Sequence, residues 1–320
     1  MITNNIQGGV QTLLENSEKN VSLKGRTWIH RGGVVGTWVI PNSIEELGEV
    51  SKYLYDINAK FQVIGHTSNL YFKNSFNIDY IIDTRKLRDI DENNNLIVCD
   101  CGVPMKRFAR YCIDHGYTGY EGFVDLPGTV GGAVVNNSGC FGCCIDKVLN
   151  GIDIMTSEGF KHLVLTDLNY SFRNSAIKVG LHKGVITKAY FDKSKVEPVE
   201  QLQKRAEQYH EQRTMTQDPP AYNLGSTVNL LGDVRGFRGI VVKVVRKCMT
   251  IMGLSSRINA IMPKVICLLY FNPSVAKYIS KKRLSCFIWK DEKADNAFPK
   301  YIDIMKKLYC KISTEIQIFE

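Results

Sequence analysis

A glycine-rich segment, residues 125–142, constrains the fold of this chain more than any other part of its sequence. It reads DLPGTVGGAVVNNSGCFG, in which one proline, five glycines and several small residues leave almost no bulky side chains. Glycine lets the main chain come close to a neighbouring group and adopt backbone angles that other residues avoid. Taken alone, the segment fits two structures equally well: a turn that closes a buried strand, or a loop whose amides contact a flat, phosphorylated ligand.

Composition places the chain among ordinary globular proteins of two or three compact units. Its 320 residues are 44% hydrophobic and 23% charged, which excludes a disordered or fibrous protein. The first twenty residues are mostly polar, and no apolar run reaches the roughly 18 residues of a membrane span, so we expect a cytoplasmic protein. The ten cysteines are irregularly spaced, which predicts reduced thiols. Cys140 and Cys143 form a C-x-x-C pair without zinc partners, so no metal is expected.

Apolar patterning predicts a mixed α and β structure. A strand over 38–40, a helix over 44–55 that Asn42 and Ser43 cap, and a strand over 61–64 form a small α/β unit. The loop that follows the last of these strands occupies the place where such units usually bind ligands. Further strands are predicted over 80–84, 96–101, 151–156, 163–165 and 184–191, and helices over 104–115 and 198–216.

The C-terminal third of the chain differs from the rest in charge and pattern. Residues 218–220, Asp-Pro-Pro, end the helix over 198–216 and mark a hinge to a second domain. Residues 227–292 contain twelve basic and three acidic residues, which gives this segment a net charge of +9. Residues 236–271 interleave apolar residues with Lys and Arg. Two interpretations stay open: buried helices whose basic residues reach water, which we favour, or a surface for a membrane or partner.

Four segments in order carry a resemblance to a known family. They are GHTSNLYF at 65–72, the glycine-rich segment within 122–142, LNYSFRNSAIK at 168–178 and RTMTQDPPAYNLGSTVNL at 213–230. Together they resemble the UDP-N-acetylenolpyruvoylglucosamine reductases, also called UDP-N-acetylmuramate dehydrogenases. The resemblance implies an α+β fold with a two-part FAD-binding domain of the vanillyl-alcohol-oxidase/PCMH-like kind and a smaller α+β substrate domain. We place the FAD-binding domain at 1–195, in subdomains of about 1–85 and 86–195, and a divergent, basic substrate domain at 196–320.

The same resemblance implies the residues that hold FAD. Two loops are involved: the first would wrap the pyrophosphate, and the second would line the isoalloxazine and its phosphate arm. Backbone amides in glycine-rich loops bind phosphate oxygens, and bare main chain accepts a flat ring. The implied cofactor-binding residues are Gly65, His66, Thr67, Ser68, Asn69, Leu70, Pro127, Gly128, Thr129, Gly131, Gly132, Ala133, Asn136, Ser138 and Gly139.

Three further residues match catalytic positions of the family. Arg173 would bind the substrate carboxylate, Ser226 would donate a proton, and Glu315 would act with the arginine. The substrate domain departs from the family's pattern at two places. Residues 227–230 read TVNL where the family has an aromatic residue and Asn-Pro, and residues 284–287 read LSCF where the family has His-x-Asn-Phe. Each of the three also has an ordinary structural interpretation: a surface ion pair, a helix cap and an exposed strand residue.

The implied reaction is reduction by NADPH, through FAD, of the enolpyruvyl group of UDP-N-acetylglucosamine enolpyruvate to UDP-N-acetylmuramate, a peptidoglycan precursor. Two alternatives stay open. One is a related flavoprotein that acts on another nucleotide sugar in surface polysaccharide synthesis. The other is a non-catalytic flavin-fold protein that docks a membrane or partner through its basic C-terminal region. A nucleic-acid partner is not expected, because aromatic residues are not interleaved with the basic cluster.

Overall fold

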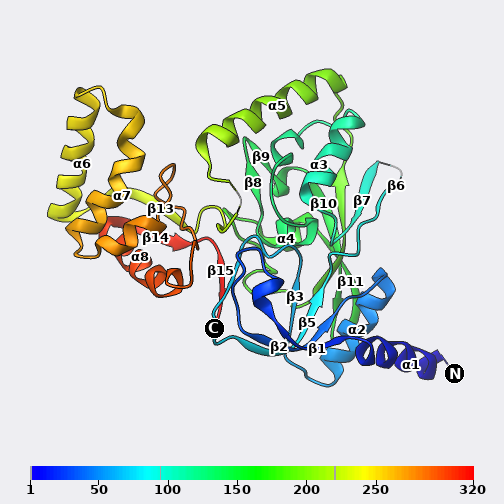
Figure 1. The fold of residues 1–320 in the computed structure, drawn as a ribbon. Coiled ribbons are helices and arrows are strands. Elements are labelled where there is room, and N and C mark those ends of the chain that lie inside the picture. The colour runs from blue at the N-terminus through cyan, green and yellow to red at the C-terminus, as the bar shows by residue number, and fades with distance from the viewer. Residues whose placement is uncertain (1, 94, 220) are drawn as a thin grey trace. The chain divides into compact units, whose positions relative to one another are not determined.

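The computed structural model describes residues 2–93, 95–219 and 221–320, with side chains described from Gly9 onward (Figure 1). Pro220, part of the predicted hinge, lies outside the described residues. The chain divides into two compact units, which are described separately below. Unit 1 comprises the chain up to Leu23, Gly33–Thr67 and Phe76–Gln212, and unit 2 comprises Lys24–Gly32, Ser68–Ser75 and Arg213–Glu320.

The first sheet of unit 1 has the strand order β1-β2-β5-β3. Strands β2, β5 and β3 run parallel, and β1 pairs antiparallel with β2 at the edge. The helix α2 begins after Ser43, whose hydroxyl accepts a hydrogen bond from the amide of Glu46, as the N-cap pattern predicts. The bounds are β1 Glu18–Ser22, β2 Val34–Val39, α2 Ile44–Asp56, β3 Phe61–Ile64 and β5 Asn77–Asp83.

The second sheet of unit 1 has the order β11-β10-β12-β7-β6 and is antiparallel throughout. Helix α3 and the short helix α4 contribute Phe108 and Val134 to a core that both sheets share. A two-stranded hairpin, β8 with β9, follows α4. The bounds are β6 Ile90–Asn93, β7 Leu96–Asp100, α3 Met105–Asp114, α4 Val130–Val135, β8 Gly139–Cys140, β9 Cys143–Cys144, β10 Leu149–Thr156, β11 Gly159–Val164 and β12 Val185–Asp192.

The segment Cys101–Val103, directly after β7, joins several parts of unit 1. A Cβ on Gly102 would lie 1.8 Å from the carbonyl oxygen of Thr84 and 2.5 Å from that of Leu87, so only glycine fits there. The amide of Cys101 donates to the carbonyl of Thr187 on β12 at 2.9 Å. This segment therefore packs main chain against main chain at the junction of the two sheets.

Two helices flank the unit 1 sheets. Helix α1, Ile2–Glu15, packs against α2 and buries Val10 in the shared core; the sequence analysis did not predict this helix. Helix α5, Val199–Thr216, was predicted to within one residue. Arg205 on α5 donates to Glu121 and Glu197, which ties the helix to the loop after α3.

Unit 2 has its own aromatic core, in which Trp289, Phe298 and Tyr301 are almost fully buried. Strand β13 pairs antiparallel with β14, and β4 pairs parallel with β15, with Leu70 beside Gln317. Helices α6, α7 and α8 complete the unit. The bounds are β4 Leu70–Phe72, β13 Val228–Val234, α6 Gly236–Ile251, α7 Ile258–Leu269, α8 Ala294–Leu308, β14 Tyr309–Thr314 and β15 Gln317–Phe319.

These elements confirm the predicted α+β class. The predicted domain boundary at residue 195 stays a prediction, whereas the compact units seen here are discontinuous in sequence. Among the residues that the structure describes, no helix combines the length and the apolar character needed to cross a bilayer.

The substitution Gly102→Ala tests the junction in unit 1. The added methyl group meets main-chain oxygens that cannot rotate away, so we expect the free energy of unfolding to fall by about 1–3 kcal/mol. Thermal and urea denaturation would measure it. Gly9→Ala on α1 is the matched control, since its Cβ would have only an ordinary contact, 3.9 Å from Glu49 Oε2. Equal stability of the two variants would contradict the close packing at Gly102.

Candidate FAD and substrate sites

The two loops predicted to bind the cofactor meet within unit 1. Gly65 follows β3, and Thr129 lies directly before α4. A Cβ on Gly65 would lie 2.3 Å from Thr129 Oγ1 and 2.7 Å from Thr129 Cγ2. The missing side chain at residue 65 is therefore what lets the two loops touch.

His66 and Thr67 continue this contact. The ring of His66 hydrogen-bonds to the main chain of Gly128, and burial, assisted by the positive charges of Arg85 and Arg88, lowers the pKa of the imidazole. Thr67 is buried and has a φ of 55°, a left-handed conformation that is rare for a β-branched residue. Backbone strain of this kind concentrates in ligand-binding loops.

The glycine-rich segment divides into a packed part and an open part. The amides of Val130 and Gly131 donate to the carbonyls of Val103 and Cys101, both at 2.8 Å. A Cβ on Gly131 would lie 3.0 Å from Cys101 Cβ, so this glycine serves close packing against the segment after β7. Gly131 and Ala133 are buried, Gly128 and Ser138 are half-buried, and Pro127 and Gly132 are exposed.

Arg173 lies beside the end of the glycine-rich segment. Its guanidinium donates to the carbonyl of Gly139 at 2.6 Å and to that of Asn137 at 3.4 Å. The backbone of Arg173 is left-handed, with a φ of 57°. Asn137 holds this region together, because its buried side chain donates to Asp146 and to the carbonyl of Ser171. The structure therefore brings the predicted catalytic arginine to the predicted cofactor residue Gly139. These two hydrogen bonds do not involve Asn136 or Ser138, the other two predicted residues of this stretch.

The hairpin β8–β9 has three half-buried thiols, of which Cys144 contacts Asn137 and the other two contact Gly122. The thiol of Cys140 donates to the carbonyl of Gly122 at 2.7 Å, and that of Cys144 donates to Asn137 Oδ1 at 3.3 Å. Burial raises the pKa of Cys143 and that of Cys144 to about 11. All ten cysteines of the chain are free thiols in the structure.

Ser226 lies in unit 2, two residues before β13. Its hydroxyl lies 3.3 Å from Ser285 Oγ, and Arg283 Nη1 donates to Ser226 Oγ at 3.5 Å. Sequence reasoning did not predict Arg283 or Ser285 as site residues. The only signal was that 284–287 departs from the family's pattern in this region.

Glu315 lies in the same unit, in the turn between β14 and β15. Its amide donates to the carbonyl of Thr227 at 3.0 Å, and its carbonyl accepts from Asn69 Nδ2 at 3.4 Å. Unit 2 therefore brings together Ser226, Glu315 and Asn69. The predicted loop 65–70 is shared between the units, since Gly65, His66 and Thr67 belong to unit 1 and Ser68, Asn69 and Leu70 belong to unit 2.

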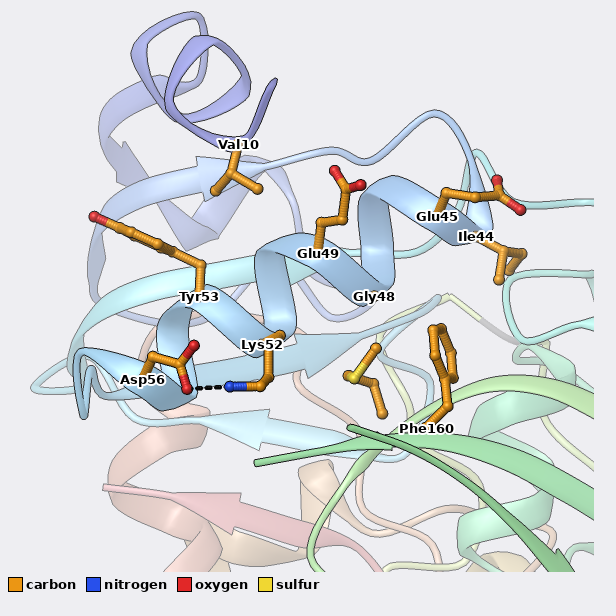
Figure 2. Close-up of a pocket in the computed structure, with 10 residues that line it drawn as sticks. Val10, Ile44, Glu45, Gly48, Glu49, Lys52, Tyr53, Asp56 and Phe160 are labelled. Atoms are coloured by element: carbon orange, nitrogen blue, oxygen red, sulfur yellow. Dashed lines mark hydrogen bonds and ion pairs between the residues drawn. The ribbon is translucent and has the colours of Figure 1, made fainter. Parts of the chain in front are cut away.

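A separate cavity of about 430 Å³ lies along α2 in unit 1 (Figure 2). Ile44, Tyr53 and Phe160 give it apolar walls, and the carboxylates of Glu45 and Glu49 stand at its edge. None of the predicted site residues lines it. This cavity is therefore distinct from the loops that meet at Gly65.

Comparisons with known proteins identify a domain that contains the loops of unit 1. Residues 37–162 match the FAD binding domain family, a range that includes Gly65 through Leu70 and the whole glycine-rich segment. The match supports FAD binding by this domain. The close approach at Gly65 and the strained backbone at Thr67 fit a loop that cradles a phosphorylated cofactor.

Relatives by sequence are UDP-N-acetylenolpyruvoylglucosamine reductases. The chain is 28% identical to that of Thermosipho melanesiensis over 50% of this chain and 53% of the relative, so the alignment spans about half of that enzyme. It is 28% identical to that of Caldicellulosiruptor saccharolyticus over 72% of this chain and 78% of the relative. Identity to that of Leuconostoc mesenteroides is 30% over 56% of this chain and 62% of the relative.

A solved structure has the same fold over most of the chain. It is the UDP-N-acetylenolpyruvylglucosamine reductase of Thermus caldophilus, with a TM-score of 0.64, 17% identity, and coverage of 95% of this chain and 99% of that one. The family model, the sequence relatives and this shared fold together confirm the resemblance predicted from the sequence.

A double substitution tests the contact between the two loops. Gly65→Ala places a methyl group against the Thr129 side chain, and Thr129→Ala removes the two nearest atoms that it meets, Oγ1 and Cγ2. We expect Gly65→Ala to cost at least about 1 kcal/mol more with Thr129 present than in a Thr129→Ala background, as measured by a thermodynamic cycle of unfolding free energies. Additive costs would show that the two residues do not touch.

The pH dependence of stability tests the environment of His66. Because its pKa is lowered in the folded protein, the unfolded chain binds the proton more tightly. Stability is then lost as pH falls below about 6.5, the ordinary histidine pKa. We expect His66→Gln to reduce the fall in melting temperature between neutral and acidic pH. His115→Gln, which removes an exposed imidazole from unit 1, is the control; an unchanged pH profile in His66→Gln would contradict the assignment.

Proposed function

We propose that this chain, a divergent relative of the UDP-N-acetylenolpyruvoylglucosamine reductases, is an NADPH-dependent flavoenzyme. Its substrate would be UDP-N-acetylglucosamine enolpyruvate and its product UDP-N-acetylmuramate, formed in the cytoplasm. The observation that carries the proposal is the contact of Arg173 with Gly139, because it joins a predicted catalytic residue to the end of the predicted cofactor loop. Bound FAD would supply a hydride carrier between NADPH and the sugar nucleotide.

Arg173 would bind the carboxylate of the enolpyruvyl group. A guanidinium binds a carboxylate with two parallel hydrogen bonds when its plane is fixed. The contacts to the carbonyls of Gly139 and Asn137 fix that plane here. The positive charge would stabilise the negative charge that develops on the substrate when hydride adds to one carbon of the double bond.

Ser226 would give the proton that completes the reduction at the other carbon. A serine hydroxyl is a weak acid, so it needs a strong base as acceptor and a stabilised alkoxide after transfer. Arg283 donates to this oxygen, and the adjacent Ser285 hydroxyl gives a second polar contact. Arg283 would thus act through Ser226 as a positioning residue.

Glu315 would be the second proposed catalytic residue of unit 2, beside Ser226. Its main chain forms hydrogen bonds with the main chain of Thr227, the residue after Ser226, and with the side chain of Asn69. These bonds hold the carboxylate in the same part of the unit as the serine. By the family resemblance it would act together with Arg173.

Separate measurement of the two half-reactions tests the proposal. Purified protein should show the absorbance of bound flavin, lose it when NADPH is added without oxygen, and regain it when the UDP-sugar is added. We expect Ser226→Ala to keep reduction by NADPH and to slow reoxidation by the sugar nucleotide about 10²–10⁴-fold, the usual contribution of a positioned acid. Arg173→Lys should also keep reduction and slow reoxidation.

The exposed Ser255 of unit 2 provides the matched control as Ser255→Ala, which should leave both steps unchanged. Equal loss of both half-reactions in Ser226→Ala would overturn the role of the serine. If only a different UDP-sugar reoxidised the flavin, the proposed substrate would be wrong and the assignment as a flavoenzyme would stand.

A further inference from the structure

Helices α6 and α7 of unit 2 pack against each other, in the yellow part of the chain in Figure 1. The sequence analysis favoured burial of their apolar residues. The structure buries Gly239, Val242 and Met249 on α6 and leaves other large apolar side chains exposed. Four of these, Phe237, Ile240, Val244 and Ile251, are called here the outward stripe, and they are 79%, 60%, 53% and 75% exposed.

The outward stripe lies on a single face of α6. Residues of an α-helix advance by about 100° each, so positions 237, 240, 244 and 251 fall within a sector of about 60°. The buried positions 239, 242 and 249 fall in a sector on the opposite side by the same arithmetic. The stripe is therefore a continuous apolar face that unit 2 does not cover.

The end of helix α7 adds two more exposed apolar side chains, Leu268 and Phe271. Leu268 on α7 is 66% exposed, and Phe271, just after the helix, is 83% exposed. The guanidinium of Arg238 on α6 lies 4.8 Å from the ring centroid of Tyr270, which joins the start of α6 to the end of α7. The exposed apolar residues of α6 and α7 thus belong to one helical hairpin, whose two ends the contact between Arg238 and Tyr270 holds together.

The charge of the hairpin has one sign only. Residues 236–271 contain six basic residues and no acidic residue: Arg238, Lys243, Arg246, Lys247, Arg257 and Lys264. Lys243 pairs with Asp233. Within the part of the chain that the structure describes, Arg246, Lys247, Arg257 and Lys264 make no ion pair. By helical position Lys243 and Lys247 border the outward stripe on one side.

We propose that the α6–α7 hairpin docks unit 2 onto the surface of an anionic lipid bilayer. An amphipathic helix with large apolar residues on one face and lysines at its border is the form in which helices lie in the headgroup region. Each Lys or Arg near an anionic leaflet contributes about 1 kcal/mol to the binding free energy. Transfer of the apolar face from water into the bilayer surface adds a further favourable free energy. A neutral protein partner would leave without a counterpart the four basic residues that make no ion pair among the described residues: Arg246, Lys247, Arg257 and Lys264.

Vesicle binding by the full-length protein tests the proposal. We expect sedimentation with phosphatidylglycerol-containing vesicles to exceed that with pure phosphatidylcholine vesicles about tenfold or more, and to weaken at about 0.5 M salt. Ile240→Ser with Val244→Ser should reduce binding about tenfold or more by removing apolar contacts. The charge variant Lys247→Gln with Lys264→Gln should reduce binding as well.

The control variant carries the same kind of change on unit 1. Phe160 and Leu181 are 59% and 69% exposed, so Phe160→Ser with Leu181→Ser removes comparable apolar surface elsewhere. This control should bind vesicles as the unmodified protein does. Melting curves would show that all variants fold, as expected for exposed positions.

A fluorescent probe on Cys248 gives an independent measurement. Cys248 on α6 and Cys310 on β14 are the exposed cysteines among the described residues. An environment-sensitive dye on Cys248, in a Cys310→Ser background, should shift to shorter wavelength when anionic vesicles are added. A dye on Cys310, in a Cys248→Ser background, should shift less.

Two results would overturn the proposal. One is equal binding of anionic and neutral vesicles by all variants. The other is concentration-dependent self-association of the unmodified protein that the stripe variant abolishes, without any vesicle binding, which would make the stripe an interface between copies of this chain. Neither result depends on turnover of a nucleotide sugar, so the flavoenzyme assignment would stand or fall separately.

Discussion

The main-chain contact of residues 101–103 is the constraint on which the rest of unit 1 depends. Gly102 lies so close to the carbonyls of Thr84 and Leu87 that no side chain fits, and this contact joins the end of β7 to the loop after β5. The carbonyls of Cys101 and Val103 then accept the amides of Gly131 and Val130. One short segment thereby fixes the distance between the two sheets and the position of the glycine-rich segment.

This arrangement changes which part of the glycine-rich segment is available to a cofactor. The amides of residues 130 and 131 already have protein partners, so they contribute packing and not phosphate binding. The amide of Gly132 is also engaged, because it donates to Thr129 Oγ1. The exposed Pro127 and half-exposed Gly128, together with the loop at Gly65, are the parts that we propose for a ligand. Composition alone cannot separate these two roles of glycine, so the sequence predicts a single role for the whole stretch.

Local signals allowed much of the fold to be predicted. Helix α2 begins where Ser43 predicts, β3 has the predicted bounds, and the predicted range 104–115 is that of α3 with its two caps. Helix α1 was missed because its sequence is mostly polar, and its packing against α2 through Val10 is a tertiary effect. The pairing of Leu70 with Gln317 joins strands far apart in sequence, which no local pattern encodes. The same holds for Arg283 beside Ser226, since the partner comes from another part of unit 2.

The thiols of the β8–β9 hairpin have a chemical consequence for a protein that binds a redox cofactor. Oxidants such as hydroperoxides attack the thiolate form of cysteine, and a raised pKa keeps Cys143 and Cys144 protonated at neutral pH. We therefore expect Cys143 and Cys144 to react slowly with such oxidants. Burial, and not a disulfide, is what holds Cys143 and Cys144 in this less reactive form.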